Sequence, residues 1–187
     1  LSLCDTNLEH IQPHQIDNTH NFLVDVCMAA KYEGESLKGY HEQYEVQYPG
    51  SGSDFSMCTM LARSFADIGD IVRGRDLYGG NNKRRQQLEN NLKTIFEKIK
   101  GNNNSTLKGL SIDEVREYWW EENRQQVWKA ITCSNELKDN RYFRQTCGGD
   151  NKKTTIRTPN QCRCDGAKGA KADQVPTYFD YVPQYLR

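Results

Sequence analysis

Two pairs of side chains in this sequence have a spacing that could support metal or acid–base chemistry. His10 and His14 are four residues apart, the separation at which two imidazoles on one helix can share a zinc ion. Pro13 lies between them and disfavours a regular helix, and no third ligand is evident. We therefore interpret them as solvated histidines.

The carboxylates of Asp67 and Asp70 are three residues apart, so they share one face of a predicted helix. Acid–base or magnesium chemistry would need an accompanying phosphate-binding loop, and none occurs in the sequence. Arg73 follows three residues later and favours an ion-paired helix end. G-x-S-x-G, P-loop and H-E-x-x-H motifs are also absent from the sequence. We predict no catalytic residue, no metal site and no cofactor, and therefore a protein that is not an enzyme.

Seven cysteines stand out in a polar chain of 187 residues, of which 36% are hydrophobic. No C-x-x-C motif occurs, and Cys162 and Cys164 are too close together for the usual zinc-knuckle spacing. The pattern favours disulfides over metal, with these two cysteines bonded to different distant partners. Because the number is odd, at least one cysteine lacks a partner within the chain. The disulfide candidates are Cys4, Cys27, Cys58, Cys133, Cys147, Cys162 and Cys164.

Basic residues of one predicted helix form a candidate site for an anionic glycan. Lysine and arginine can pair with sulfate or sialate groups, arginine through bidentate contacts. The candidates are Lys83, Arg84, Arg85, Lys93, Lys98 and Lys100. A second basic set comprises Arg141, Arg144, Lys152, Lys153 and Arg157. A solvated charged face, interleaved with Glu89 and Glu97, is the competing interpretation.

The overall charge excludes one large class of partner. The chain has 25 basic and 25 acidic residues, a balance that does not suit a binder of duplex nucleic acid, so we expect no nucleic-acid partner.

No stretch approaches the ~18 apolar residues that a membrane span needs. The first residue is Leu1, and the sequence stops within an aromatic and apolar stretch. We interpret the sequence as a fragment of a longer chain.

Apolar residues at helical spacing dominate the first two thirds of the sequence. The first expected helix begins near Thr19, and Gly34 is placed to end it. Further helices are expected to begin at Ser36, at Asp54 as an N-cap, near Lys83, and at the capping box Ser111–Glu114. Trp119 lies on an apolar stripe and is predicted to be a core residue. Trp128 is one residue off that stripe, so we expect it to be half-buried.

These elements predict an all-α fold. Helices joined by modest loops suggest an antiparallel bundle, which we place within residues 1–133. Residues 134–174 lack sustained periodicity and are predicted to form an irregular segment held by disulfides. Residues 175–187 are expected to begin a further helical subdomain.

Four blocks of the sequence resemble a known family. They are CMAAKYEG at 27–34, LARSFADIGDIVRG at 61–74, YWW to WKAITC at 118–133, and CRC followed by VPTYFDYVPQ at 162–184. Together they resemble the alpha class of Duffy-binding-like domains, the N-terminal adhesion domains of the variant erythrocyte membrane protein 1 family of the malaria parasite. The resemblance implies a helical, disulfide-linked fold of three subdomains, of which residues 1–187 would be a single truncated domain.

The resemblance also implies a function. Such a domain would lie on the extracellular face of the infected erythrocyte membrane, in a parent protein anchored elsewhere in its chain. It would bind host erythrocyte or endothelial receptors in cytoadherence and rosetting, with antigenic variation in its exposed loops. The ligands implied by the family are heparan sulfate-like glycans, blood-group sugars and complement receptor one.

Two alternatives remain open from the sequence. The chain could be a protein-recognition module that docks a receptor polypeptide through exposed aromatic residues such as Tyr78, without glycan binding. It could also be a scaffold whose binding site lies in parts of the protein outside this sequence.

Overall fold

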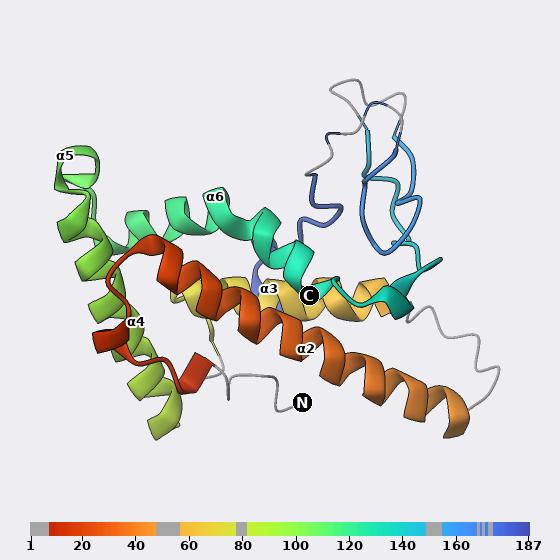
Figure 1. Cartoon of the computed structure of the whole chain (residues 1–187), viewed down its shortest axis with the longest axis horizontal. Coiled ribbons are helices and arrows are strands. Elements are labelled where there is room, and N and C mark those ends of the chain that lie inside the picture. Colours follow the sequence, from red (N-terminus) through yellow and green to blue (C-terminus); the bar gives the residue numbers. More distant parts are fainter. Residues whose placement is uncertain are drawn as a thin grey trace.

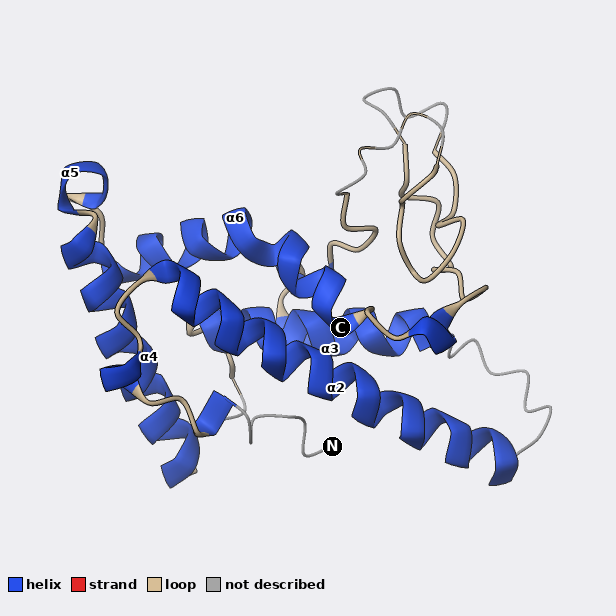
Figure 2. Ribbon diagram, viewed as in Figure 1, coloured by secondary structure: helices blue, strands red, loops and turns tan. Residues whose placement is uncertain are grey.

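The computed structural model describes residues 8–47, 57–77, 82–148, 155–167, 169, 171 and 174–187. Its α-helices are α2 (Thr19–Gln47), α3 (Met57–Arg73), α4 (Lys83–Asn102), α5 (Asn104–Leu107) and α6 (Ile112–Ile131). Short 3-10 turns are η1 (Pro13–Gln15), η2 (Asn135–Leu137), η3 (Phe179–Tyr181) and η4 (Gln184–Leu186). Within these ranges no β-strand forms, and Figure 2 shows helices joined by loops. The predicted all-α fold is confirmed. The cap predicted at Asp54 lies outside the described residues.

Three helices form the body of the molecule. α2, α3 and α6 contact one another, and α4 contacts α6. Figure 1 shows α4 lying across the ends of α2 and α6, whereas the irregular segment after α6 projects from the opposite end. The capping box predicted at the start of α6 is present, because the Ser111 and Glu114 side chains each bind the other's backbone.

Aromatic rings fill the spaces between the helices. Phe22 of α2 contacts Phe96 of α4 edge-on at 5.2 Å between ring centroids, and Trp119 of α6 joins them. The prediction that Trp119 belongs to the core is confirmed, since the residue is buried. The prediction that Trp128 is half-buried is wrong, because only 2% of the residue is exposed. Its ring packs edge-on against Phe65, and its Nε1 donates to the carbonyl oxygen of Cys162.

Gly34 does not end its helix, contrary to the sequence-based expectation. α2 runs through it as a single helix of 29 residues. The glycine is needed for close packing, because a Cβ built at Gly34 would lie 2.3 Å from the backbone oxygen of Ile131 at the end of α6. A helical glycine without a side chain thus lets two backbones approach, and packing outweighs the propensity of glycine to terminate helices.

We expect Gly34→Ala to lower the free energy of unfolding by about 1–3 kcal/mol, the usual cost of overpacking. Its matched control is Gly39→Ala in the same helix, where a new Cβ meets nothing within 4 Å. That control should raise the free energy of unfolding by about 0.5–1 kcal/mol, since alanine favours helix more than glycine does. Urea denaturation measures both. Equal effects of the two substitutions would contradict the close approach of α2 and α6.

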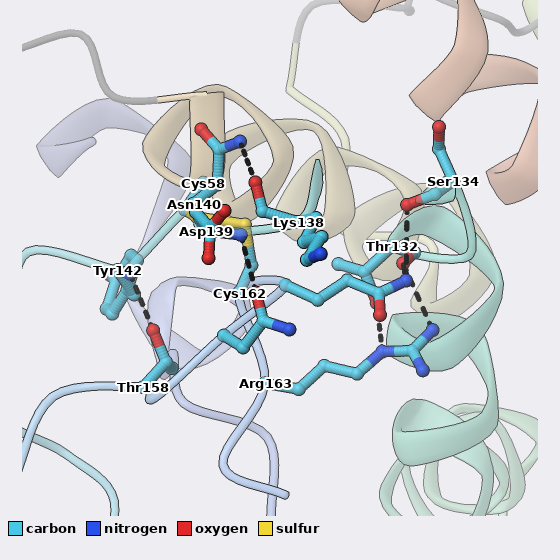
Figure 3. The surroundings of a disulfide bond; sticks show 12 residues. Cys58, Thr132, Ser134, Lys138, Asp139, Asn140, Tyr142, Thr158, Cys162 and Arg163 are labelled. Carbon is cyan, nitrogen blue, oxygen red and sulfur yellow. Dashed lines mark hydrogen bonds between the residues drawn. A yellow bond between two sulfur atoms is a disulfide. The ribbon is translucent and has the colours of Figure 1, made fainter. Parts of the chain in front are cut away.

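Two disulfides hold the irregular segment. Cys58 of α3 is bonded to Cys162, and Cys147 is bonded to Cys164. The expectation that the neighbouring cysteines have different partners is thereby confirmed. Figure 3 shows the first crosslink among side chains that fasten the segment to the end of α6, including Arg163, which donates to Thr132. The long-range bond joins residues 104 positions apart, so it fixes the irregular segment to the helical body.

Candidate functional site

The pairs of residues considered for catalysis do not assemble a reaction centre. His10 and His14 are exposed, and the chain between them leaves the helical conformation before the turn η1. Asp70 accepts a hydrogen bond from Arg73 at 3.2 Å, so the ion pair predicted at this helix end is present. Across the described ranges, no group of three His, Cys, Asp or Glu side chains could hold a metal ion. Nor does any helix in these ranges have the length and apolar character of a membrane span.

The six basic residues predicted as a glycan site all belong to α4, but they have different environments. Three have internal partners. Arg85 pairs with Asp76 at 2.8 Å, Lys98 donates to the carbonyl oxygen of Pro13, and Lys100 donates to that of Leu110. These bonds fasten α4 to neighbouring segments.

The other three basic residues of α4 are exposed. Lys83 and Arg84 form the first turn of the helix, and Lys93 lies ten residues further along, about 15 Å at the rise of an α-helix. The first turn contains no acidic residue. Lys83 and Arg84 are thus consecutive residues at one helix end, and the structure places Lys93 apart from them. Of the interleaved acidic residues, Glu97 is exposed and Glu89 pairs with Arg116.

Three of the seven predicted cysteines are not in the two disulfides. Cys4 lies outside the described residues, Cys27 is half-buried on α2, and Cys133 is exposed just after α6. Burial raises the pKa of the Cys27 thiol to about 11. At neutral pH this thiol is therefore almost wholly protonated and poorly nucleophilic.

We expect iodoacetamide at pH 8, without reductant, to modify Cys133 at least about 100-fold faster than Cys27, because thiolate is the reactive form. Peptide mapping by mass spectrometry gives the two rates separately. The second disulfide, Cys147–Cys164, serves as the internal control and should remain unmodified. Equal rates at Cys27 and Cys133 would contradict the buried environment of Cys27.

Apart from the pairing of Arg73 with Asp70, sequence reasoning missed a buried network of charged side chains that holds the last residues of the chain. Asp180 accepts hydrogen bonds from Trp120 Nε1 at 2.9 Å and from two nitrogens of Arg124 at 2.7 and 2.8 Å. Arg73 donates to the carbonyl oxygen of Asp180, and burial lowers the pKa of this arginine. Arg187 pairs with Asp67 and with Asp70. Paired charges thus hold the turns η3 and η4 against α3 and α6.

Arg116 is a second buried cation that the sequence did not reveal. It is 1% exposed, although it occupies a charged stretch of α6. Its guanidinium makes a bidentate pair with Glu89 of α4 at 2.7 and 3.0 Å and donates to two carbonyl oxygens at the end of α3. The signal in the sequence was weak, because the spacing of apolar residues says nothing about which arginine faces inward.

The comparison with known proteins identifies the family. The model of the Duffy binding domain matches residues 1–187, and this chain therefore belongs to the Duffy binding domain family. The Duffy receptor beta form of Plasmodium knowlesi is 33% identical over 94 residues, which are 50% of this chain and 7% of that protein. The gamma form from the same organism is 31% identical over 94 residues, or 50% of this chain and 8% of that protein.

Solved structures show the same fold. The NTS-DBL1(alpha-1) domain of Plasmodium falciparum membrane protein 1 (PfEMP1) from the varO strain has a TM-score of 0.70 at 34% identity, over 98% of this chain and 39% of that chain. The ICAM-1-binding DBLbeta domain of PfEMP1 IT4var13 has a TM-score of 0.61 at 30% identity, over 90% of this chain and 34% of that chain. The same domain bound to ICAM-1 has a TM-score of 0.64 at 28% identity, over 96% of this chain and 39% of that chain. The chain thus spans about two fifths or less of the domains that it resembles.

Proposed function

We propose that this chain is a host-cell adhesion domain, carried outside the infected erythrocyte by a longer membrane protein. Membership of the Duffy binding domain family is the observation that carries this proposal. Two disulfides in the described residues support it, because such crosslinks persist in oxidising, extracellular surroundings. The helical body is a rigid scaffold, and the ligand would bind to exposed residues on it.

The ligand that we favour is an anionic glycan of the heparan sulfate type, bound at the first turn of α4. Lys83 and Arg84 are consecutive exposed residues there, and the N-terminal end of a helix itself favours negative charge. Two cations at this end oppose the helix dipole in the free protein. A sulfate or carboxylate placed among them would relieve that repulsion and receive charge-assisted hydrogen bonds. Lys93 would contact a longer glycan further along the helix.

Binding to immobilised heparin across a salt series tests this site. The oxidised, folded chain should bind, with affinity falling as salt rises, because exposed charges are screened. Lys83→Ala with Arg84→Ala should weaken binding about tenfold or more, the expected loss of two charge-assisted contacts. The matched control is Lys108→Ala with Lys138→Ala, which removes two exposed lysines elsewhere.

Heparin binding that is indifferent to salt, or equal losses in the two double variants, would contradict the proposed α4 site. Circular dichroism of each variant establishes that its helices are intact, so a loss of binding can be assigned to the side chains.

A protein receptor is the second candidate ligand, favoured by an exposed apolar row on α2. Val24, Met28 and Tyr32 are spaced four residues apart and are 47%, 41% and 45% exposed. Residues at this spacing lie along one face of a helix. One solved relative, the DBLbeta domain of PfEMP1 IT4var13, is described as ICAM-1-binding and was also solved bound to ICAM-1, so a polypeptide receptor suits this family. Tyr78, the aromatic residue suggested by the sequence, lies outside the described residues.

We expect Tyr32→Ala to weaken binding to a polypeptide receptor about 30-fold, as removal of an aromatic hot spot does. Surface plasmon resonance against ICAM-1 is the first assay, with Tyr118→Ala on α6 as the exposed aromatic control. Such binding should change little with salt, unlike binding to heparin. Loss of heparin binding in Tyr32→Ala, with no effect on a protein receptor, would overturn this second candidate.

A further inference from the structure

An exposed row of residues on α2 has the spacing of a helix–helix contact. Its positions follow one another at intervals of four, three, four and three residues, which is the heptad pattern of a coiled coil. All five side chains are uncharged, and they lie towards the C-terminal end of the helix. We call this row the α2 seam, and its members are Tyr32, Ser36, Gly39, Gln43 and Val46.

The α2 seam is not covered by the helical body. The last buried residue of α2 is Leu37, and none of the residues 39–47 is buried. Tyr32 is 45% exposed, Val46 is 83% exposed, and a Cβ built at Gly39 would meet nothing within 4 Å. Figure 1 shows this end of α2 extending past α3 and α6. Because helices in proteins are stabilised mainly by the packing of one face, the uncovered seam indicates a partner.

Small residues in the middle of the seam would let another backbone approach closely. Ser36 and Gly39 occupy neighbouring seam positions, and both are exposed. A glycine inside a helix is less favourable than alanine, so its presence at an exposed position needs a reason. At Gly34 in the same helix the reason is visible, because the missing side chain admits the backbone of Ile131. By the same reasoning, Gly39 admits a backbone from outside the chain.

The residues beside the seam indicate a partner with the same sequence. Glu35 and Glu42 flank the seam on one side, and Tyr40 and Gln47 flank it on the other. In a parallel pair of identical helices, each flanking position faces the residue five positions later on the opposite flank of the other helix. Glu35 would then face Tyr40 of the second copy, and Glu42 would face its Gln47. Each carboxylate would meet a hydrogen-bond donor instead of another carboxylate.

The charge of the chain also permits two copies to associate. The 25 basic and 25 acidic residues give a formal net charge of zero, and proteins near zero net charge associate most readily. Charges beside the seam are paired within α2 itself. Lys31 lies 3.9 Å from Glu35, and Lys38 lies 3.5 Å from Glu42. A strongly charged partner of either sign would therefore gain little from this surface.

We propose that two copies of this chain pair through the α2 seam as a short, parallel coiled coil. Two-fold symmetry places each seam residue against the same residue of the second copy. The seam is about 21 Å long from Tyr32 to Val46, at the rise of an α-helix. Because so short a contact lies below the standard size of a stable interface, we expect a dissociation constant on the order of 10–100 µM.

Weak pairing becomes effective where many copies are held in one surface. Tethering raises the effective concentration of a binding partner to about the millimolar range. A pair would present the first turn of α4 twice, so that binding to a repetitive ligand would gain avidity. This consequence rests on the proposed adhesion function, whereas the pairing itself does not.

Sedimentation equilibrium of the folded chain from about 5 to about 500 µM tests the pairing, because this range brackets the expected dissociation constant. Treatment with iodoacetamide first blocks the exposed Cys133, so that it cannot join two copies by a disulfide. We expect mainly monomer at the lowest concentration and mainly dimer at the highest. Hydrogen exchange should show protection of residues 39–47 that increases over the same range.

Two substitutions in the seam have matched controls. Gln43→Glu should weaken pairing about tenfold or more, because it places two like charges against each other. Gln126→Glu makes the same change on the exposed surface of α6 and should have no effect. Gly39→Gln should weaken pairing about tenfold or more by blocking the close approach. Its control is Gly101→Gln in α4, another helical glycine with no neighbouring atom within 4 Å.

Two results would overturn the proposal. The first is a monomer at every concentration. The second is a dimer that the seam substitutions weaken no more than their controls do, which would place the pairing on another surface. The variants leave Tyr32 unchanged, because it also belongs to the row considered for a protein receptor. The α4 variant with Lys83→Ala and Arg84→Ala should pair like the unmodified chain, so a failure of the glycan site is distinguishable from a failure of the seam.

Discussion

Replacing Cys58 and Cys162 with alanine is expected to lower the free energy of unfolding by about 4–5 kcal/mol. The bond closes a loop with a sequence separation of 104, and loops of about this size gain that much from a crosslink. The loop contains nearly all of α3 together with α4, α5 and α6. Without the disulfide, the unfolded chain therefore gains conformational freedom over most of the helical body. Urea denaturation without reductant measures the change.

The second disulfide provides the matched comparison. Cys147–Cys164 has a sequence separation of 17, for which the expected loss on replacement by alanine is about 3 kcal/mol. The sulfur-bearing residues of both pairs are buried, so the packing cost of the alanines should be similar. If removal of the short-range bond costs more than removal of the long-range one, the long-range bond is not what holds the irregular segment to the helical body.

Removal of the Asp180 carboxylate is the second change with a large expected effect. Asp180→Ala should lower the free energy of unfolding by about 3–5 kcal/mol, because Arg124 would remain largely buried without its counter-ion. Trp120 Nε1 would also lose its acceptor. Thermal unfolding followed by fluorescence of the three tryptophans, all of them buried in the core, measures the change.

Two further substitutions separate the charge of Asp180 from its packing. Asp180→Asn keeps an oxygen acceptor in the same place and should cost less than Asp180→Ala. Asp113→Ala removes an exposed carboxylate from the first turn of α6 and should cost only about 0.3–1 kcal/mol, the value of a favourable helix-dipole contact. Similar costs for Asp180→Ala and Asp113→Ala would show that the buried network contributes little to stability.

The sequence allowed the helices to be predicted where one face is regularly apolar. The start of α6 was predicted from the capping box at Ser111, and a helix was correctly expected to begin near Lys83, where α4 starts. Gly34 was misinterpreted because a glycine that ends a helix and one that admits a neighbouring backbone look the same in sequence. Only the position of Ile131 distinguishes the two.

The candidate sites were less accessible from the sequence. Proximity on α4 suggested one cluster of six cations, yet Arg85, Lys98 and Lys100 have partners from other segments, which periodicity cannot reveal. Arg144 was noted as part of a basic set, but its contact with the ring of Phe179 joins distant parts of the chain, which the sequence does not reveal. The division of the chain at residues 133 and 174 into a bundle, an irregular segment and a further subdomain stays a prediction.

The measurement that tests the central claim most directly is binding of the oxidised, folded chain to human erythrocytes and endothelial cells by flow cytometry. The adhesion account predicts saturable binding, reduced by heparinase treatment of the cells and by the variant with Lys83→Ala and Arg84→Ala. Binding that survives both treatments but is lost in Tyr32→Ala would place adhesion on α2 and on a protein receptor. No binding to either cell type by a chain with intact helices and disulfides would contradict the account, and would make this part of the protein a scaffold for a site elsewhere.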